Sequence, residues 1–380
     1  MARILIGMSG GVDSSVAAAL LAREGHQVTG VTLKLWDGAE DSDAPWQERS
    51  CCKVGIARHV CDKVGIPHRV VDLREGFRAH VVEDFLNAYE RGETPNPCVR
   101  CNESVKITGL LRYAEENGFD TIATGHYARI ERTGWGAWRM LGGVDPAKDQ
   151  SYFLYRIPRV SLGRIRFPLG GLRKPQVMQM ARDMGLPADE IAESQEICFV
   201  GGGDYRDFLR AERPAVARPG DIVDTTGRVL GRHAGVALHT IGQRRGLQVS
   251  TGQRAYVVST DAASGRVVVG PPEALDCGGL IAGELNLLAP FPASGHVRVR
   301  LRHRGALLPA GVTLHGPETA DSADARDGGG MLTLHFDTPQ RAVAPGQSAV
   351  LYDGDTVLGG GIIRRALPVE VVADARRGAA

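Results

Sequence analysis

The sequence predicts an α/β protein in which a parallel sheet wrapped by helices precedes a β-rich second half that ends in a barrel. Two observations lead to this prediction. Apolar runs of strand length alternate with helical periodicity over the first third of the chain. From about residue 218 helical periodicity disappears, and short Val-rich runs are separated by Gly, Asp and Pro. We therefore expect a parallel-sheet domain, a small central β-rich domain, a C-terminal β-barrel and a tail, at residues 1–204, 205–275, 276–370 and 371–380.

Strands and helices follow one another in the first domain. Residues 3–8 are a short apolar run before a Gly/Ser turn, and residues 12–22 have helical spacing with many Ala and Leu. Further strands are predicted at 28–33, 69–72 and 121–124, and further helices at 51–64, 77–89 and 104–117. Asn117-Gly118 is typical of the end of a helix. Because such alternation builds a parallel sheet, we expect ligands at the carboxyl ends of the strands.

The second half shows only strand patterns. Its runs are short and end at Gly, Asp or Pro, at residues 221–223, 228–230, 255–259, 266–269, 296–302, 332–336, 348–352 and 357–363. Strands at this spacing are typical of small barrels or sandwiches. Pro271-Pro272 marks the predicted boundary between two β units. Residues 317–330 are rich in Ala, Asp and Gly and predict a surface insertion, and the tail from residue 373 predicts disorder.

The composition is that of an ordinary globular protein. The 380 residues are 43% hydrophobic and 23% charged, and no apolar run approaches the ~18 residues that a membrane span needs. Met1 leads straight into a strand without the features of a signal peptide, so we expect a cytoplasmic protein. The net charge of +1 does not by itself indicate a nucleic-acid partner. However, residues 150–182 hold seven basic and no acidic side chains, which suits phosphate contact as well as a solvated face.

Seven cysteines, an odd number, argue against a disulfide framework and favour catalytic or metal-binding thiols. Cys98 and Cys101 lie in a proline-stiffened loop at residues 94–102. We expect Cys101 to stand just before a helix, with Asn102 as its cap, so that the helix N-terminus favours the thiolate. Cys198 stands among polar residues at 193–199. The remaining cysteines receive no role: Cys51, Cys52, Cys61 and Cys277.

A Gly/Ser-rich turn follows the first strand and opens the first helix. Its residues are Ser9, Gly10, Gly11, Val12, Asp13, Ser14 and Ser15. The glycines let the backbone curl tightly, so that N–H groups and hydroxyls gather at a helix N-terminus, where an anion is favoured. The turn lacks the Lys-Ser/Thr end of a Walker A loop, and it is not the dinucleotide pattern G-x-G-x-x-G. It resembles the PP-loop of ATP pyrophosphatases, which cleave ATP between the α and β phosphates and transfer AMP to an oxygen.

The turn, the two cysteine segments and four further motifs together resemble the tRNA-specific 2-thiouridylase family. The further motifs lie at residues 124–129, 145–152, 240–246 and 345–348, and the matches extend from Gly7 to about residue 363. The resemblance implies a tRNA-uridine 2-sulfurtransferase that uses ATP and Mg²⁺ to make 2-thiouridine at the wobble position of glutamate, lysine and glutamine tRNAs. It also implies a persulfide donor protein, such as a cysteine desulfurase or a relay protein. We expect the chain to be a monomer.

The resemblance also assigns roles to individual residues. Cys198 would carry a persulfide, Cys101 would be the second catalytic thiol, and Asp13 would hold Mg²⁺ or orient the pyrophosphate. The ATP site would comprise Gly7, Met8, Ser9, Gly10, Gly11, Val12, Asp13 and Ser14, with Leu33 and Gly125 along the adenosine. The residues that would contact the tRNA are Asn96, Pro97, Cys98, His126, Lys148, Asp149, Gln150, Arg300, Leu301 and Gln347.

These residue types suit the implied chemistry. The C2 oxygen of uracil is a poor leaving group, and adenylation turns it into AMP, which leaves readily. The persulfide on Cys198 then attacks C2, or releases sulfide that does. Attack of Cys101 on the Cys198 sulfur frees the transferred sulfur and leaves a disulfide for a reductant to open. The target base has to leave its stack to reach the thiols.

Cys98 departs from the family pattern, because many members carry Asp at this position. Together with Cys101 and Cys198 it makes a set of three thiols, which suits a [4Fe–4S] cluster with one open position. The alternatives are a redox pair with Cys101 or a neutral substitution.

Four arginines alternate along an expected strand and would share one face suited to gripping an RNA backbone: Arg298, Arg300, Arg302 and Arg304. Two other functions stay open. One is another PP-loop enzyme, such as a 4-thiouridine or lysidine synthetase or an amide-forming ligase. The other is a tRNA-binding sulfur-relay protein without ATP turnover. The thiols argue against a ligase, and the intact PP-loop turn argues against an inactive ATP site.

Overall fold

The computed structural model describes residues 1–36, 53–186, 188, 197–201, 203–250, 252–291, 294–316 and 330–369. Cys51, Cys52, nearly all of the expected insertion and the tail at 371–380 lie outside these ranges. By its contacts the chain divides into two compact units. The first comprises Met1–Val82, Pro97–Gly202 and Asp355–Val357, and the second comprises Glu83–Asn96, Gly203–Gly354 and Leu358–Ala380. The domain boundaries expected at 204/205 and 275/276 stay predictions.

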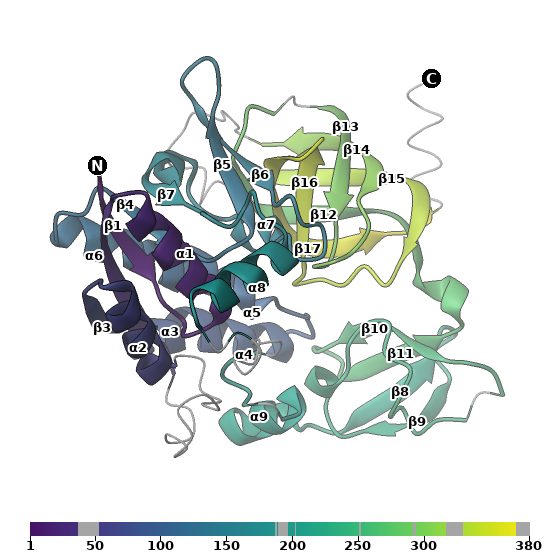
Figure 1. Cartoon of the computed structure of the whole chain (residues 1–380). Coiled ribbons are helices and arrows are strands. Elements are labelled where there is room, and N and C mark those ends of the chain that lie inside the picture. Colours follow the sequence, from purple (N-terminus) through teal and green to yellow (C-terminus); the bar gives the residue numbers. More distant parts are fainter. Residues whose placement is uncertain are drawn as a thin grey trace. The chain divides into compact units, whose positions relative to one another are not determined.

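The first unit is built on a five-stranded parallel sheet (Figure 1), which confirms the predicted fold class. The strand order is β3-β2-β1-β4-β7, and every neighbouring pair is parallel. The central strand β1 is buried on both faces, as is typical of a parallel sheet covered by helices. The strands are β1 (Arg3–Gly7), β2 (Gln27–Lys34), β3 (His68–Asp72), β4 (Thr121–Thr124) and β7 (Ile165–Arg166).

Helices cover both faces of this sheet. One apolar cluster joins Ile4 and Ile6 of β1 to α1 (Val12–Arg23), α2 (Val54–Val64) and α8 (Lys174–Asp183), and Figure 1 shows α1 beside α8. Side chains alternate along a strand, so position 7 faces the opposite way. There Leu110 of α6 (Thr108–Glu116) lies 3.3 Å from where a Cβ on Gly7 would stand.

The helix that carries Cys98 and Cys101 begins earlier than the sequence pattern predicts. It runs without a break through α5 (Pro97–Arg100), the π-helical turn η2 (Cys101–Ile107) and α6. Proline suits the first position of a helix, where its missing N–H costs nothing. Cys101 therefore lies one turn inside the helix, and the prediction that it precedes a helix capped by Asn102 is wrong. The other end agrees with prediction, because Asn117 caps α6 and Gly118 follows with φ +70°.

Several elements of the first half were not predicted from sequence. A second helical run covers the predicted helix at 77–89 and starts slightly earlier, with α3 (Arg74–Phe77), η1 (Arg78–Val82) and α4 (Glu83–Glu90). The unpredicted elements are the antiparallel hairpin of β5 (Ala128–Arg132) and β6 (Trp138–Gly142), then α7 (Ser151–Leu154), η3 (Arg159–Arg164), β7, α8, α9 (Tyr205–Glu212) and η4 (Pro214–Val216).

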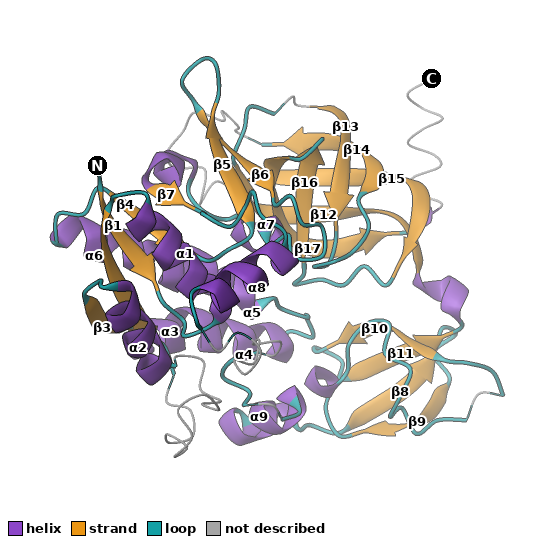
Figure 2. Ribbon diagram, in the orientation of Figure 1, coloured by secondary structure: helices purple, strands orange, loops and turns teal. Residues whose placement is uncertain are grey.

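The region after η4 is mostly strands and loops (Figure 2), as predicted. The central part is one sheet in the order β10-β11-β8-β9, and the last part is a six-stranded barrel that the β12–β17 pairing closes. The central elements are β8 (Gly220–Asp224), β9 (Val229–His233), η5 (Val236–Leu238), β10 (Tyr256–Asp261), β11 (Arg266–Gly270) and η6 (Pro272–Leu275). The barrel strands are β12 (Asp276–Leu287), β13 (Ser294–Arg300), β14 (Leu308–His315), β15 (Met331–Arg341), β16 (Ser348–Asp353) and β17 (Thr356–Leu367). Among the described residues, no helix has both the length and the apolar character to span a bilayer.

Candidate active site

The turn after β1 is held in a tight curl by its own hydroxyls. The Ser9 N–H donates to Ser14 Oγ at 3.3 Å, and the Gly11 N–H donates to Ser9 Oγ at 3.3 Å. The Ser14 and Ser15 hydroxyls donate to the Gly11 carbonyl at 3.0 and 2.9 Å. α1 begins at Val12, and its N-cap Gly11 has no side chain with which to cap it. The first N–H groups of α1 can therefore be satisfied by the oxygens of a phosphate.

Two glycines let other segments approach this turn closely. Gly10 has φ +73°, and a Cβ there would lie 2.5 Å from the Cβ of Lys53. A Cβ on Gly125 would lie 2.7 Å from the Ser14 nitrogen and 2.8 Å from the Asp13 carbonyl carbon. Any larger residue at 125 would press on the backbone at the start of α1. Gly125 therefore fixes the position of the turn, a role that the sequence pattern did not reveal.

The sheet order brings the remaining predicted ATP residues to the same edge. Gly7 ends β1, Leu33 lies near the end of β2, and Gly125 directly follows β4. Because β2, β1 and β4 are adjacent and parallel, their carboxyl ends meet at one edge of the sheet. Met8 and Val12 are only 2% and 4% exposed and belong to the apolar cluster of the sheet, so their side chains are not available to a ligand.

Asp13 has two partners that sequence reasoning missed. The Tyr127 hydroxyl donates to Asp13 Oδ1 at 2.8 Å, and Lys174 Nζ donates to the same oxygen at 2.8 Å. The side chain of Lys174 is 14% exposed and that of Asp13 is 32% exposed. Both donors use Oδ1, which leaves Oδ2 without a partner among the described residues. The carboxylate is thus fixed through one oxygen and available through the other.

Lys174 is positioned by the turn at residue 145. It is the first residue of α8, and its backbone N–H donates to Asp145 Oδ2 at 2.8 Å. Asp145 Oδ1 accepts the Ala147 N–H at 3.0 Å. The hydrogen bond from Lys174 lowers the pKa of Asp145, burial opposes the shift, and the bond from Ala147 adds to it. A carboxylate that stays ionised at a helix N-terminus stabilises the start of α8.

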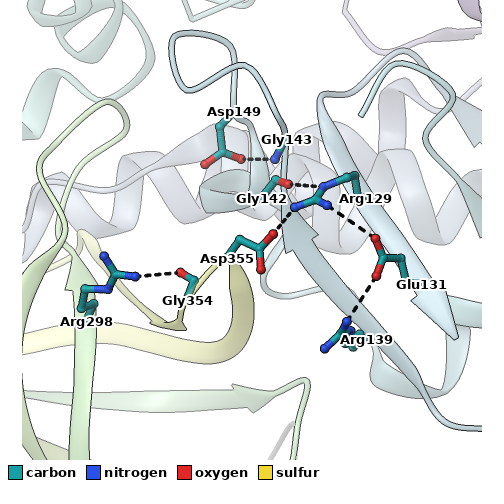
Figure 3. Close-up of polar contacts among 9 residues, drawn as sticks. All are labelled: Arg129, Glu131, Arg139, Gly142, Gly143, Asp149, Arg298, Gly354 and Asp355. Carbon is teal, nitrogen blue, oxygen red and sulfur yellow. Dashed lines mark hydrogen bonds and ion pairs between the residues drawn. The ribbon is translucent and has the colours of Figure 1, made fainter. Parts of the chain in front are cut away.

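Figure 3 shows how the beginning of this turn is fixed. Asp149 is buried, and its Oδ1 accepts the Gly143 N–H at 3.1 Å. Arg129 Nε donates to the Gly142 carbonyl at 2.9 Å, and Arg129 Nη2 pairs with the Asp355 carboxylate. Asp355 is distant in sequence but belongs to the same unit. The Asp149 carboxylate is engaged by backbone, and its contact with tRNA stays a prediction.

Gln150 and Lys148 complete the turn. The Gln150 N–H donates to the Tyr127 carbonyl at 2.9 Å, and the Tyr127 N–H donates to Gln150 Oε1 at 3.0 Å. The Lys148 N–H donates to the Asp145 carbonyl at 3.0 Å. This reciprocal pairing orients Tyr127, whose hydroxyl contacts Asp13. Residues predicted at the target base are therefore bonded to the residue that holds the PP-loop carboxylate.

His126 is a neutral group in this structure. Its Nδ1 shares a hydrogen bond of 2.7 Å with the Thr124 hydroxyl, and its ring meets the edge of Phe167 at 6.0 Å between centroids. Burial lowers the pKa of His126 to about 3, and the charge of Lys106 acts in the same direction. A neutral imidazole can hydrogen-bond to a base or stack on it, but it cannot pair with a phosphate as a cation.

The structure relates the predicted thiols as follows. Cys98 and Cys198 are exposed, whereas Cys101 is buried. Cys98 reaches solvent, but protein atoms surround its side chain closely. The resulting desolvation raises the pKa of the Cys98 thiol. The charge of Lys106 opposes the shift, and Cys198 adds to it. Two cysteines 100 positions apart in the sequence therefore act on each other electrostatically.

An aromatic cluster anchors the chain beside Cys198. Phe199 is 5% exposed, and its ring lies 6.1 Å from Trp36 and 5.8 Å from Phe77 between centroids. Trp36 closely follows β2 and Phe77 ends α3, so two separate elements hold this segment. The anchor leaves Cys198 exposed next to a fixed neighbour.

The iron–sulfur alternative does not fit this arrangement. Cys98, Cys101 and Cys198 are all within the described part of the chain, yet that part contains no group of three His, Cys, Asp or Glu side chains placed to hold a metal ion. We derive no step through a cluster.

Some basic side chains of residues 150–182 form ion pairs with acidic residues elsewhere in the chain. Arg156 is 5% exposed and its Nε lies 2.7 Å from Glu103, and Lys174 pairs with Asp13. Neither side chain faces solvent as a phosphate-binding surface would require. Glu103 and Asp13 are remote in sequence, so a local charge count could not reveal these partners. Asn102, expected as a cap, is buried, and its Oδ1 has no hydrogen-bond partner within the described ranges.

The arginine row of the second unit is shorter than predicted. β13 ends at Arg300, and Arg302 and Arg304 lie in the turn beyond it, Arg304 with φ +62°. The prediction that all four arginines share one strand face is therefore wrong, because only Arg298 and Arg300 lie in the strand. Arg300 stands over the Tyr352 ring at 5.2 Å.

The other predicted tRNA residues lie at two places. Leu301 packs against the barrel core, and Gln347 Nε2 donates to the Thr94 carbonyl at 2.7 Å. Pro97 is the buried first residue of α5, and Asn96 immediately precedes it. Their contacts with RNA stay predictions.

Comparison with known proteins identifies the family. The chain matches the models of a tRNA methyl transferase HUP domain over residues 2–202, its PRC-barrel domain over 206–271 and an aminomethyltransferase β-barrel domain over 278–363. The protein named tRNA-specific 2-thiouridylase MnmA from Geobacter metallireducens is 46% identical over 371 residues, which cover 96% of this chain and 97% of that one. Its namesake from Chloroflexus aggregans is 46% identical over 370 residues, which cover 96% and 99%. Identity of this extent, in a chain whose PP-loop turn and thiol segments are intact, means that this protein belongs to the tRNA-specific 2-thiouridylase family.

Proposed function

We propose that this protein is an ATP-dependent tRNA-uridine 2-sulfurtransferase, which converts the wobble uridine of tRNA to 2-thiouridine in the cytoplasm. The observation that carries the proposal is the 46% identity with a named 2-thiouridylase over 96% of the chain. The geometry supports it, because the PP-loop carboxylate of Asp13 is held in place by Tyr127 and Lys174.

ATP would bind at the carboxyl edge of the parallel sheet. Its phosphates would accept N–H groups from the turn at the start of α1, and its adenosine would lie along Leu33 and Gly125. The uracil C2 oxygen attacks the α-phosphate, and pyrophosphate leaves with the electrons of the α–β bond. Lys174 places a positive charge 2.8 Å from Asp13, where it can stabilise the departing pyrophosphate.

Asp13 also fits a magnesium ion. Mg²⁺ is usually held by one or two carboxylates together with substrate phosphates and water. Asp13 Oδ2 has no partner among the described residues and would hold the ion with the phosphates of ATP. The bound ion would neutralise phosphate charge during adenylation.

Sulfur transfer would use Cys198 and Cys101. The terminal sulfur of a Cys198 persulfide attacks C2 of the adenylated uridine, and AMP leaves with the electron pair of the C–O bond. The Cys101 thiolate then attacks the Cys198 sulfur, breaks the S–S bond to the transferred sulfur and leaves a thiocarbonyl on the base. The product disulfide of Cys101 and Cys198 is reduced by two electrons from an external thiol. A persulfide donor protein, such as a cysteine desulfurase or a relay protein, recharges Cys198.

The residues predicted to contact the tRNA come from both units. In the second unit Arg300, Leu301 and Gln347 would contact the RNA, with Arg300 supplying charge. In the first unit the neutral His126 would contact the target base by hydrogen bonding or stacking, near Lys148 and Gln150. The flipped base would then meet Cys198, which is exposed.

The experiment that tests the proposal is nucleoside mass spectrometry on unmodified glutamate tRNA. The tRNA is incubated anaerobically with the protein, ATP, Mg²⁺ and a persulfide source. We expect 2-thiouridine to form together with pyrophosphate. Cys198→Ser should form no 2-thiouridine, and Asp13→Ala should release no pyrophosphate. Pyrophosphate with a different modified nucleoside would overturn the assignment in favour of another PP-loop enzyme. If tRNA binds but no pyrophosphate forms, the protein is a relay without ATP turnover.

A further inference from the structure

One segment of the chain is joined in sequence to the thiol helix but belongs by its contacts to the second unit. Glu83–Asn96, which we call the strap, comes directly before Pro97 and the helix of Cys98 and Cys101, yet its contacts group it with the second unit. The strap consists of α4 and the loop after it. Its position in the chain and its contacts therefore link the thiol helix to the second unit, whose barrel is predicted to bind RNA.

The strap is fastened first to the central domain. Arg213 Nη1 pairs with Glu90 at 2.9 Å, and Arg213 Nη2 pairs with Glu83 at 2.5 Å. The Thr260 hydroxyl donates to the Gly92 carbonyl at 2.8 Å. Arg213 thus bridges the carboxylates at the first and last residues of α4, and this double ion pair fixes the direction of the helix.

The strap is fastened a second time to the barrel, at residues that come shortly before Cys98 in the sequence. The Thr94 N–H donates to the Pro345 carbonyl at 2.8 Å. Gln347 Nε2 donates to the Thr94 carbonyl at 2.7 Å and to the Pro95 carbonyl at 3.3 Å. Between them, Gly346 has φ +89°, and a Cβ there would lie 2.9 Å from the Thr94 backbone. Pro345 and Gln347 thus hold Thr94 by its N–H and its carbonyl, and Gly346 between them lies against its backbone.

The barrel turn is itself rigid, so it can act as a fixed support. The Gly346 N–H donates to the Ile363 carbonyl at 2.9 Å, and the Ile363 N–H donates to the Gln347 carbonyl at 2.8 Å. Ile363 belongs to β17, which closes the barrel. A displacement of Gln347 would therefore be transmitted to Thr94 and Pro95 rather than absorbed within the turn.

We propose that Gln347 is a positioning residue, which holds the strap at Thr94 and Pro95 and thereby sets the start of the helix that carries Cys98 and Cys101. The inference rests on the proposed function, because it concerns the thiols of the sulfur transfer. An RNA group that takes hydrogen bonds from Gln347 Nε2 has to compete with the two strap carbonyls. RNA bound at the barrel is thus coupled to the conformation of the thiol helix.

The first test measures the reactivity of Cys101 in protein without RNA. Cys101 is buried, so iodoacetamide reaches it only when the helix start opens locally. In Gln347→Ala the loss of both hydrogen bonds should speed alkylation of Cys101, read by peptide mass spectrometry, by about tenfold. The matched control is Gln340→Ala, whose amide donates, among the described residues, only to Thr338 on its own strand. We expect Cys101 in that variant to react at the wild-type rate.

A second pair of variants uses glycines instead of the amide. Gly346→Ala and Gly227→Ala have nearly the same backbone strain, since φ is +89° and +88°, but only the first brings a Cβ against Thr94. Gly346→Ala should speed alkylation of Cys101 and Gly227→Ala should not. Equal acceleration in both, or in Gln340→Ala as well, would mean general loosening and would overturn the proposal.

The third measurement separates positioning from RNA contact. At saturating tRNA, Gln347→Ala should lower the rate of 2-thiouridine formation about tenfold while the tRNA Kd changes less than about threefold. Arg300→Gln should do the reverse. If Gln347→Ala weakens tRNA binding as Arg300→Gln does, with Cys101 reacting at the wild-type rate, Gln347 is an RNA contact only. Failure of the proposed function would instead show as absent thiolation in the wild type, and the alkylation result would still stand.

Discussion

Gly125→Ala tests whether the PP-loop turn depends on a close approach of two backbones. The new Cβ would stand 2.7 Å from the Ser14 nitrogen, 2.8 Å from the Asp13 carbonyl carbon and 3.0 Å from the Ser14 Cα. The shortest of these falls 0.7 Å short of the 3.4 Å at which ordinary contact begins. All three neighbours are backbone atoms, so no rotamer change can relieve the clash. Either β4 or the start of α1 has to move by several tenths of an ångström.

Such a movement has consequences for stability and for activity. Overpacking of a buried site costs about 1–3 kcal/mol, which urea unfolding would detect as a lower midpoint with an unchanged slope. Misplacement of reacting groups by up to 1 Å can cost about 100-fold in rate, so we expect tRNA-dependent pyrophosphate release to fall by that order. Because Gly125 contacts the turn rather than the barrel that we propose binds RNA, the salt dependence of tRNA binding should not change.

The matched control is Gly171→Ala. Gly171 lies in the same unit, and a Cβ there would meet no atom within 4 Å. The Gly171→Ala variant should have the same urea midpoint and the same rate of pyrophosphate release as the wild type. If Gly125→Ala keeps wild-type stability and pyrophosphate release, the close approach does not position the turn, and the reasoning from the backbone distances is refuted.

Four further variants test other parts of the site. Lys174→Met should raise the KM for ATP and slow pyrophosphate release by about 10–100-fold. Lys63→Met, whose amine contacts only the Gly185 carbonyl within the described part of the chain, should do neither. Cys198→Ser should abolish thiolation and leave tRNA affinity intact in a filter-binding assay; full thiolation would remove the persulfide from Cys198. Arg300→Gln should weaken tRNA binding and reduce the slope of log K against log salt by about 1, and an unchanged slope would exclude a phosphate contact. The pKa of His126 is lowered to about 3, so unfolded His126 binds a proton between pH 6.5 and 3 while folded His126 does not. As the pH falls below 6.5, the free energy of unfolding of the wild type should therefore fall by up to about 1.4 kcal/mol per pH unit relative to that of His126→Gln. Urea titrations in which both proteins lose the same stability between pH 7 and pH 5 would contradict this.

Local patterns predicted those parts of the molecule whose structure is decided locally. The PP-loop turn can be predicted because its structure depends on residues that are neighbours in sequence. Two glycines, a carboxylate and three hydroxyls lie within seven residues, and the hydrogen bonds of Ser9, Ser14 and Ser15 remain within the turn. The parallel sheet was readable because β1 carries three consecutive buried apolar residues between turns. The C-terminal stop at Gly118 was equally local.

Contacts between residues far apart in the sequence cannot be predicted from local patterns. Lys174 and Asp13 are 161 positions apart, and nothing near either residue indicates the other. Only the order β2-β1-β4, together with the packing of α8 against α1, brings them together. The start of the thiol helix was missed for a different reason. Pro97 was interpreted as a loop stiffener, although proline is equally suited to the first turn of a helix, and only tertiary packing decides between the two.

The site gains its precision from residues that do not themselves react. Asp13 is fixed by Tyr127, which the Gln150 turn orients, and by Lys174, which the Asp145 turn positions. The family resemblance assigns Gln150 to the tRNA, but in this structure the same side chain holds the backbone of the residue that holds the PP-loop carboxylate. A tRNA that engaged this turn would therefore act on the proposed adenylation site through two hydrogen bonds. By the same logic it would act on the thiols through Gln347 and Thr94. Both couplings would make ATP cleavage and sulfur transfer depend on a correctly bound tRNA, which protects ATP and the persulfide from reaction with water in its absence.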